Sequence, residues 1–598
     1  MATLDLKPSE MPHKFNFAVD VIDKWADQRD DLQAMHWVSQ DESNTRHMTF
    51  KYFSRQSHRI AILLDQLGFG KGDTMTMVLP RVPAWWEVAL AAIRSGIILS
   101  PGPNLLTEKE IQYRCNKTKS RLFVGDETSV SKFLAVRQHC PTVKHIIRVG
   151  DGTRSQDVSS LYAALEDIET HARFDSLYQE WSSPAMIYFT SGTSGHPKMV
   201  RHNQVMLSLG KVPSTSHLAG SRQSPLEHCG PRFVKSFTRE VQNDIVDPLA
   251  GWAKAAWSFF GAWNSGATLF VHDDRGAFSA KRTVDILCRY PITTLCAAPL
   301  IFRQLVSPEL EDHFKRNPPA ALAHCTTAGE ALNAIVTQRW RQLTGLDIYE
   351  GYGQTETALL CANLKGSTIR PGSMGKPAPG VPLHIITATG AEAAHNEEGD
   401  IAVLLSDRKG SSNFFGIFDG YVQEDNTCTR NERTVTVDGE VKSYYLTGDR
   451  ATRDQDGYFW FVGRADDVIN SSGYRIGMLE PQRFESLFPD NFLGPFEVES
   501  TLKLHPAVVE AAVISSPDPG RGEVVKAFVV RTREYENAPP QELEQELQTF
   551  CKKNAAPYKY PRKLEFVEGS FLPRTTSGKI QRALLRKLEW RKEAGSKL

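Results

Sequence analysis

Residues 188–198 read Tyr-Phe-Thr-Ser-Gly-Thr-Ser-Gly-His-Pro-Lys. A run of hydroxyl residues and glycines that ends in a lysine is typical of a backbone that wraps a polyphosphate, because amide N–H groups and hydroxyls donate to phosphate oxygens. The apolar residues 186–189 predict a short strand that feeds this loop, which favours a phosphate-binding loop over a Ser/Gly-rich linker. The spacing does not fit a Walker loop, and Pro197 disfavours a helix directly after it.

Short apolar runs alternate with longer helical patterns on both sides of this loop. Helices are predicted at Pro83 to Ser95 and at Ala277 to Arg289. Strands are predicted at Thr74 to Leu79, Arg121 to Val124, His145 to Val149, Thr268 to His272 and Ile292 to Ala297. This alternation predicts layered α/β structure with mostly parallel sheet. Near the carboxyl end, Ala507 to Ser515 and Val524 to Val530 indicate strands of a smaller α+β domain.

Composition argues against several classes of protein. The 598 residues include 70 basic and 70 acidic side chains, so no net field favours nucleic acid or an anionic membrane as a partner. A chain of this length is expected to divide into domains. Nine cysteines are scattered without a C-x-x-C pair, which argues against a zinc site and is typical of a reducing compartment. No apolar run reaches the roughly 18 residues that span a bilayer, so no transmembrane segment is expected.

The last three residues, Ser596-Lys597-Leu598, match the peroxisomal import tripeptide. Residues 1–14 carry acidic side chains and lack an apolar core, which is not typical of a signal or transit peptide. We therefore expect location in the peroxisomal matrix, with the peroxisomal import receptor as a partner, and in the cytoplasm if the tripeptide is not read. The alternative interpretation is a coincidental basic tail, since residues 586–597 are rich in charge.

Three further segments follow the loop along the chain. They read Glu350-Gly351-Tyr352-Gly353-Gln354-Thr355-Glu356, then Leu446-Thr447-Gly448-Asp449 with Gly463-Arg464-Ala465-Asp466-Asp467 and Ser472-Gly473-Tyr474-Arg475, and finally Pro573-Arg574-Thr575-Thr576-Ser577-Gly578-Lys579-Ile580. With the loop, these segments resemble the adenylate-forming superfamily of acyl-CoA synthetases, peptide-synthetase adenylation domains and luciferases, over nearly the whole chain. Phe15-Asn16-Phe17 and residues 469–475, 515–519 and 556–562 are similar to the medium-chain acyl-CoA synthetase subfamily.

The resemblance implies a large N-terminal domain at 1–465, made of layered α/β sheets with a small β-barrel, and a small mobile C-terminal α+β domain at 466–598. Asp466 is the expected hinge. The implied enzyme is an AMP-forming acid–thiol ligase that converts a medium-chain fatty acid, ATP and CoA to acyl-CoA, AMP and pyrophosphate through an acyl-adenylate, with Mg2+ as cofactor. The alternatives are a ligase for an aromatic acid such as benzoate or phenylacetate, and a catalytically impaired nucleotide-binding homologue.

The family's motifs imply a role for individual residues. Lys579 is expected to bridge the acyl carboxylate and the α-phosphate, Thr355 to donate to the α-phosphate, and Glu356 to ligate magnesium. Tyr352 is expected against the adenine ring and Asp449 at the ribose. The ATP-binding residues implied by the resemblance are Thr190, Ser191, Gly192, Thr193, Ser194, Gly195, His196, Pro197, Lys198, Glu350, Gly351, Tyr352, Gly353, Gln354, Thr355, Asp449, Arg464 and Arg475. Without the resemblance, Asp449 would be interpreted as a turn aspartate and Lys579 as a solvated lysine.

The second half-reaction and the acyl group have residues of their own in the resemblance. The implied CoA-binding residues are Ser472, Gly473, Tyr474, Arg521 and Lys552. Trp252 is expected to line an apolar acyl pocket, together with residues 357–360, Ala298 and Pro299. No basic residue offers a partner for a second carboxylate, which favours a monocarboxylic acid.

Residues 211–251 and 478–494 depart from the family pattern, because each runs longer than the resemblance implies. Each is interpreted either as a surface loop, which folds tolerate well, or as untranslated sequence retained by a faulty gene model. The second segment directly follows the implied CoA loop, so it bears on CoA transfer. A module that loads a carrier protein and a luciferase-like oxygenase share the same motifs and remain alternative enzymes.

Overall fold

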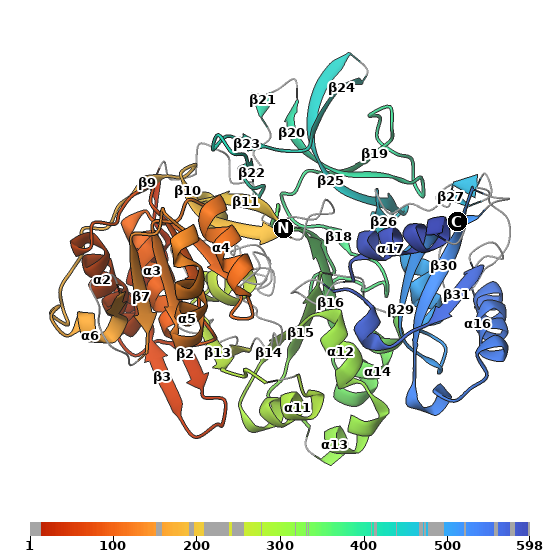
Figure 1. Cartoon of the computed structure of the whole chain (residues 1–598), viewed down its shortest axis with the longest axis horizontal. Helices are drawn as coiled ribbons and strands as arrows, with labels where there is room; N and C mark the ends of the chain where they lie inside the picture. Colours follow the sequence, from red (N-terminus) through yellow and green to blue (C-terminus); the bar gives the residue numbers. More distant parts are fainter. Residues whose placement is uncertain are drawn as a thin grey trace.

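The computed structural model describes residues 14–150, 158–190, 197–208, 239–241, 256–276, 278–316, 318–329, 332, 334–407, 410–411, 416–437, 439–465, 470–471, 474–475, 495–518, 522–554, 560–574 and 580–595. Figure 1 shows two α/β layers at the left and centre, an antiparallel sheet at the top, and a smaller carboxyl-terminal unit at the right. This architecture confirms the fold class expected from the sequence.

The first sheet contains the two strands that flank the predicted phosphate loop. Its strands are β4 (Thr74–Val78), β5 (Ile98–Gly102), β6 (Leu122–Asp126), β7 (His145–Val149), β8 (Val158–Ser160), β10 (Pro184–Thr190), β11 (Lys198–Asn203), β22 (Gly420–Val422) and β23 (Cys428–Thr429), in the order β23-β22-β11-β10-β5-β4-β6-β7-β8. The strands from β10 to β8 run parallel, whereas β10, β11, β22 and β23 pair antiparallel. The strands β4, β6 and β7 confirm the strands predicted there.

The second sheet has mixed direction. Its strands are β2 (Gln33–Val38), β3 (Thr45–Thr49), β12 (Arg239–Val241), β13 (Thr268–His272), β14 (Thr294–Cys296), β15 (His324–Ala328), β16 (Ile348–Gly353), β17 (Leu359–Ala362) and β18 (Lys376–Pro377), in the order β18-β17-β16-β15-β14-β12-β13-β2-β3. The strands β13 and β14 confirm two further predictions. Strand β12 lies between them and pairs parallel with both, and its residues 239–241 come from the unusual segment 211–251.

Helices cover these sheets, and several of them begin at a side-chain cap. The longer helices of this part are α2 (Phe50–Gln66), α3 (Ala84–Ser95), α4 (Glu108–Lys117), α5 (Glu127–Val136), α11 (Ala280–Arg289), α12 (Pro299–Leu305) and α14 (Ala334–Thr344). The shorter ones are α1 (Lys24–Gln28), α6 (Leu161–Leu165), α7 (Gln204–Ser208), α10 (Ala262–Asn264) and α13 (Glu311–Arg316). Thr107 and Glu110 form a reciprocal capping box at the start of α4. Helices α3 and α11 confirm the helices predicted there.

A third sheet of the large amino-terminal part is antiparallel. Its strands are β19 (Leu383–Ile386), β20 (Gly399–Asp407), β21 (Gly410–Ser411), β24 (Glu432–Val437), β25 (Glu440–Arg453) and β26 (Phe459–Arg464). Its core includes Ile385, Val403 and Tyr445 and also takes in Val200 of β11 and Leu360 of β17. The third sheet therefore packs directly against strands of both α/β sheets.

The carboxyl-terminal unit has a sheet and a core of its own. It contains β29 (Val508–Asp518), β30 (Gly522–Arg531) and β31 (Lys563–Phe566), with α15 (Pro495–Leu502), α16 (Pro540–Asn554) and α17 (Arg582–Gly595), and the short pair β27 (Asn470–Ser471) and β28 (Tyr474–Arg475). Val513, Val529, Leu543 and Leu547 are among its core residues. The strands β29 and β30 confirm the two strands predicted near the carboxyl end.

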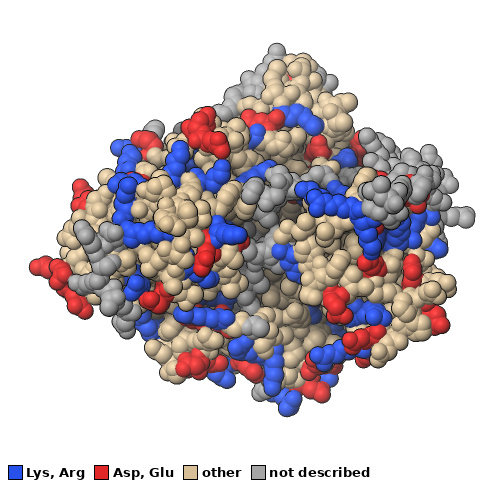
Figure 2. All heavy atoms as spheres, in the orientation of Figure 1, with Lys and Arg blue, Asp and Glu red and all other residues tan. Residues whose placement is uncertain are grey.

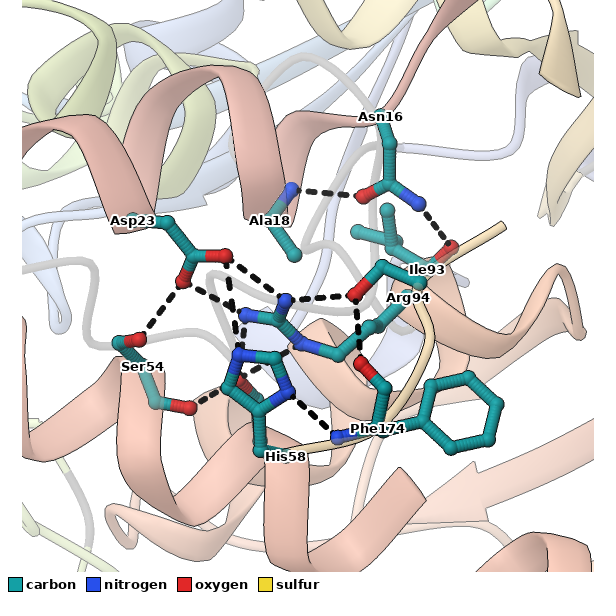
Figure 3. A network of polar contacts seen from close by, with 10 residues as sticks. Asn16, Ala18, Asp23, Ser54, His58, Ile93, Arg94 and Phe174 are labelled. Carbon is teal, nitrogen blue, oxygen red and sulfur yellow. Dashed lines mark hydrogen bonds and ion pairs between the residues drawn. The ribbon is translucent and has the colours of Figure 1, made fainter. Parts of the chain in front are cut away.

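A buried polar network fixes the amino-terminal segment to helices α2 and α3 (Figure 3). Arg94 of α3 is fully buried, and its two terminal nitrogens each lie 2.8 Å from one carboxylate oxygen of Asp23. The hydroxyl of Ser54 on α2 donates to Asp23 at 2.6 Å. Asn16 donates to the carbonyl of Ile93 at 3.1 Å. Asn16 belongs to one of the stretches that resemble the medium-chain subfamily, and here it has a structural role.

Basic and acidic side chains are mixed on the visible face of the molecule. Lys and Arg side chains are interspersed with Asp and Glu over the face seen in Figure 2, in line with the equal numbers of basic and acidic residues. Among the helices of the described ranges, none is long and apolar enough to cross a bilayer.

Candidate active site

The predicted phosphate loop connects two antiparallel strands. Thr190 ends β10 and Lys198 begins β11, and these two residues are partners in the antiparallel register. The carbonyl of Pro197 accepts a hydrogen bond from the hydroxyl of Tyr113 on α4 at 3.1 Å. The strand predicted before the loop is confirmed, and a strand follows the loop in place of a helix, as Pro197 indicated. Both ends of the loop are therefore held by sheet and by α4.

The second motif runs along β16 and beyond its carboxyl end. A Cβ atom at Gly353 would lie 2.5 Å from the carbonyl oxygen of Ala358, so the close approach of β16 to β17 requires glycine there. Glu350 is buried, and its Oε1 accepts a hydrogen bond from the backbone N–H of Leu332 at 3.2 Å. Glu350 thus supports a neighbouring loop, a role that the motif alone did not indicate.

Asp449 collects hydrogen bonds from side chains on β16, on the turn that follows it and on β26. Its Oδ2 accepts from the hydroxyl of Tyr352 and from Nε2 of Gln354, both at 2.6 Å. Nη1 of Arg464 lies 3.2 Å from Oδ1, and the register of β25 and β26 pairs these two residues. Burial, followed by the charge of Asp449, raises the pKa of Tyr352 well above its ordinary value, so Tyr352 stays a donor. The result is a buried anion surrounded by donors.

Glu356 lies where the second motif meets the phosphate-loop strand. Its Oε1 accepts a hydrogen bond from the hydroxyl of Tyr421 at 2.8 Å, and its carbonyl accepts from the N–H of Phe418 at 2.9 Å. Nζ of Lys198 lies 4.7 Å from the centroid of the Tyr421 ring. Burial raises the pKa of Glu356, and the Tyr421 hydroxyl partly offsets this. Lys198, Tyr421 and Glu356 thus form a continuous cluster.

Sequence reasoning missed two residues of this site. Tyr421 belongs to none of the motifs, and only the antiparallel pairing of β22 with β11 brings it to Lys198. His202 on β11 is fully buried, and burial lowers its pKa to about 3 despite a contact with the backbone of Thr355. His202 is therefore neutral at physiological pH and packs behind the motif with Tyr188, whose ring centroid lies 5.9 Å away.

Other predicted site residues are placed only partly. Those outside the described residues are Ser191, Gly192, Thr193, Ser194, Gly195, His196, Trp252, Asp466, Ser472, Gly473, Arg521 and Lys579. For Tyr474 and Arg475 the structure describes the backbone, which forms β28 opposite β27. Lys552 lies on α16, and its Nζ is 4.2 Å from the centroid of the Tyr560 ring.

The residues expected near the acyl group lie on two elements. Ala298 caps α12 and Pro299 is its first residue. Thr357 is buried, and its hydroxyl oxygen accepts from the N–H of Gln354 at 3.0 Å, while Leu360 is fully buried in the core of the third sheet. Within the described ranges, no group of three or more His, Cys, Asp or Glu side chains is arranged to hold a metal ion.

Comparison with known proteins defines the class to which this fold and site belong. The family model described as "AMP-binding enzyme" matches residues 22–405, and "AMP-binding enzyme C-terminal domain" matches residues 497–579. The chain belongs to the AMP-binding enzyme family. It is 40% identical over 588 residues to human "acyl-coenzyme A synthetase ACSM5, mitochondrial", with 97% of this chain and 92% of that protein covered. It is 39% identical to mouse "acyl-coenzyme A synthetase ACSM3, mitochondrial", with 97% and 92% covered.

A solved structure agrees with these relatives. The crystal structure of the anthranilate CoA ligase AuaEII in complex with anthranoyl-AMP superimposes with a TM-score of 0.78 at 25% identity, covering 98% of this chain and 99% of that one. The resemblance to acyl-CoA synthetases that the motifs indicated is confirmed.

The expected location is wrong. The terminal Ser596-Lys597-Leu598 led us to expect the peroxisome and its import receptor as a partner, whereas these relatives are described as mitochondrial. A match of three residues carries little information beside identity over 97% of the chain, and the tripeptide itself lies outside the described residues.

Proposed function

We propose that this protein converts a medium-chain fatty acid, ATP and CoA to acyl-CoA, AMP and pyrophosphate through an acyl-adenylate. It is an acid–thiol ligase, as its acyl-coenzyme A synthetase relatives are. The observation that carries the proposal is the geometry of two adjoining clusters. One surrounds the Asp449 carboxylate with donors, and the other joins Lys198 to Glu356 through Tyr421 at the end of the phosphate loop.

The first half-reaction brings two anions together. A carboxylate oxygen of the acid attacks the α-phosphorus of ATP, the new P–O bond forms, and the bond to pyrophosphate breaks. Catalysis then depends mainly on positioning and on charge neutralisation. In our proposal the hairpin from Thr190 to Lys198 holds the β- and γ-phosphates and stabilises the departing pyrophosphate. Thr355 donates to the α-phosphate.

Asp449 and its donors are proposed to bind the nucleoside. An ionised carboxylate accepts hydrogen bonds from a ribose diol, and hydrogen bonds to charged groups contribute about 1.5–3 kcal/mol each. Arg464 holds one oxygen of Asp449 and Tyr352 holds the other, so the carboxylate is oriented before ATP binds. Tyr352 also presents a ring on which the adenine can stack.

Glu356 fits the magnesium ion that the family implies. Its carboxylate oxygens are hard ligands of the kind that Mg2+ prefers, and burial raises the pKa of Glu356, a shift that a nearby divalent cation would oppose. The described residues offer no larger ligand cluster, in keeping with an ion held largely by phosphate and water. When bound, the ion neutralises phosphate charge, and Glu356 orients it.

The carboxyl-terminal unit is proposed to serve both half-reactions. Lys579 neutralises the acyl carboxylate and the α-phosphate during adenylation. The domain at 466–598 then rotates at Asp466 relative to the domain at 1–465. This rotation moves Lys579 away from the acyl-adenylate and brings the CoA site to it. That site is formed by Ser472, Gly473, Tyr474, Arg521 and Lys552. The thiol of the bound CoA attacks the acyl carbonyl carbon, and AMP leaves. The separate core of this unit supports such a movement.

Two acid classes are proposed in order. Medium-chain fatty acids come first because the relatives are acyl-coenzyme A synthetases and Trp252 with residues 357–360 forms an apolar pocket in our proposal. Aromatic acids come second because a structural neighbour is an anthranilate CoA ligase. The names of the relatives also lead us to propose a mitochondrial location, which subcellular fractionation tests.

A substrate panel tests the proposal. Acid-dependent ATP–pyrophosphate exchange is measured with straight-chain acids of increasing length, with benzoate, phenylacetate and anthranilate, and with a dicarboxylic acid as control. We expect the largest kcat/KM for medium-chain acids and none above background for the dicarboxylic acid. A maximum for the aromatic acids would favour the second class, and no acid-dependent exchange at all would contradict the function.

A further inference from the structure

We propose that Tyr421 is a positioning residue for both phosphate-binding groups of the site: its hydroxyl holds the Glu356 carboxylate and its ring holds the Lys198 ammonium. This inference rests on the proposed function, in which Glu356 orients magnesium and Lys198 binds pyrophosphate. Tyr421 lies in none of the motifs of the chain, and it is the side chain through which two of them meet.

The contact with Glu356 is directional. The hydroxyl of Tyr421 donates to Oε1 at 2.8 Å, and it occupies one oxygen of a carboxylate that has two. A carboxylate held at one oxygen cannot rotate freely, so Oε2 keeps one direction for a cation. Because Glu356 follows β16 in an irregular turn, its backbone alone does not impose that direction.

The contact with Lys198 is made through the ring face. Lys198 is exposed, and its ammonium lies 4.7 Å from the centroid of the Tyr421 ring, within the distance at which an aromatic face attracts a cation. A lysine has four rotatable side-chain bonds, and an exposed one ordinarily samples many rotamers. The ring therefore favours the rotamers that keep the ammonium over Tyr421, whose hydroxyl holds Glu356.

The segment before Tyr421 is fixed to both partners, so the ring cannot follow one of them alone. Asp419 accepts hydrogen bonds from Nε of Arg201 at 3.1 Å and from Asn203 at 2.7 Å, both on the strand that Lys198 begins. On the other side, the N–H of Phe418 donates to the carbonyl of Glu356 at 2.9 Å. Gly420 adopts a φ of 145°, where a Cβ would lie 2.8 Å from Cys428.

Tyr458 provides a matched control within the same chain. Its hydroxyl donates to the carbonyl of Thr368 at 2.6 Å, and Nζ of Lys376 lies 4.7 Å from its ring centroid. Like Tyr421, it donates its hydroxyl and carries a cation on its ring, although the acceptor is a neutral carbonyl and Arg370 also lies over the ring, 4.5 Å from its centroid. Its partners belong to none of the phosphate-binding motifs. Substitutions at Tyr458 measure the general cost of losing such contacts.

Two substitutions separate the two contacts. Tyr421→Phe removes the hydroxyl and keeps the ring, whereas Tyr421→Leu removes both. We expect Tyr421→Phe to raise the Mg2+ concentration for half-maximal ATP–pyrophosphate exchange about tenfold, because the variant loses one hydrogen bond to a charged group. Tyr421→Leu is expected to raise the KM for pyrophosphate in addition, by about threefold, for the lost ring contact. Tyr458→Phe and Tyr458→Leu should leave both values within about twofold of the wild type.

A binding measurement accompanies the kinetics. Electron paramagnetic resonance measures Mn2+ affinity in the complex with a non-hydrolysable ATP analogue. We expect Tyr421→Phe to bind Mn2+ about tenfold more weakly than the wild type, and Tyr458→Phe to bind it as the wild type does. Conversion of supplied acyl-adenylate to thioester, which needs no magnesium–ATP, should stay within about twofold of the wild type. If it falls as far as the exchange reaction, Tyr421 supports the fold only and the inference is wrong.

The remaining outcomes distinguish the two proposals. Equal Mn2+ affinities for the wild type and Tyr421→Phe would overturn the role of Tyr421, whatever the enzyme catalyses. A wild type that binds Mn2+ and the nucleotide but shows no acid-dependent exchange would contradict the proposed function, and the comparison of Mn2+ affinities would still decide the role of Tyr421.

Discussion

The hydroxyl of Tyr352 lies 2.6 Å from Oδ2 of Asp449, which joins the predicted adenine-binding residue to the predicted ribose-binding residue. The same carboxylate accepts from Gln354 and lies 3.2 Å from Arg464. A carboxylate has about four acceptor positions, so two ribose hydroxyls cannot join these three donors without displacing one. In our proposal, nucleoside binding therefore includes a rearrangement of hydrogen bonds around Asp449.

The first prediction concerns this rearrangement. Asp449→Asn is expected to raise the KM for ATP about tenfold or more, because a charged acceptor is lost. Tyr352→Phe is expected to change it by less than about threefold, because the hydroxyl occupies a position that the ribose also uses. The KM for ATP in pyrophosphate exchange is the measurement. A larger effect for Tyr352→Phe than for Asp449→Asn would contradict this account of Asp449.

The second prediction separates the half-reactions. Lys579→Ala should abolish acyl-adenylate formation, because the two anions then meet without a cation between them, and should spare the conversion of supplied acyl-adenylate to acyl-CoA. Single-turnover measurement of each half-reaction tests it. Lys587→Ala, at an exposed position on α17, is the control and should leave both rates unchanged. Equal losses in both half-reactions for Lys579→Ala would count against the assigned role.

The third prediction concerns stability and pH at the network of Figure 3. Burial alone would raise the pKa of Asp23, but hydrogen bonds from His58 and Arg94 and the charge of Arg94 hold it well below its ordinary value of 3.8. Because the pKa of Asp23 is lower in the folded state than in the unfolded chain, its ionisation stabilises the folded state at pH values above the unfolded pKa. This contribution to the free energy of unfolding is lost as the pH falls below about 4.

Asp23→Asn leaves the buried Arg94 charge without its partner, which costs about 3–5 kcal/mol at neutral pH. Melting temperatures between pH 7 and pH 3 test this. The wild type should lose stability more steeply than Asp23→Asn below about pH 4, and the exposed control Asp27→Asn should follow the wild type. Parallel curves for the wild type and Asp23→Asn would show that the pair does not carry the effect.

The fourth prediction compares two glycines with left-handed backbone. Gly375 has a φ of 86°, and a Cβ there would lie 2.0 Å from the backbone carbon of Ala362, whereas Gly457 has a φ of 84° and no heavy atom within 4 Å of such a Cβ. Gly457→Ala should cost only the strain of the conformation, about 1–2 kcal/mol. Gly375→Ala should prevent correct packing of β17 against β18. Soluble yield and melting temperature measure both, and similar values for the two variants would contradict the clash.

Local patterns predicted the elements that carry the motifs. The apolar run 186–189 predicted the strand before the phosphate loop, and Pro197 indicated that no helix follows the loop directly. The partners of those elements were not predictable in this way. Tyr421 reaches Glu356 across 65 residues because β22 pairs with β11, and no local signal specifies that pairing.

Similar reasons explain the other differences. Glu350 stands in a motif of predicted ATP-binding residues, yet its carboxylate contacts the N–H of Leu332, a partner set by how neighbouring loops pack. His202 stands in none of the motifs, and its burial, which keeps it neutral, depends on the packing around β11. The prediction of a peroxisomal location was wrong for a different reason, because a three-residue match has no structural context to support it.

One measurement tests the central claim most directly. Purified protein is incubated with a medium-chain fatty acid, ATP, Mg2+ and CoA, and the nucleotide and thioester products are quantified together. The account predicts equal amounts of AMP and acyl-CoA, with neither formed when the acid is left out. Formation of ADP in place of AMP, or release of AMP that does not depend on the acid, would contradict it.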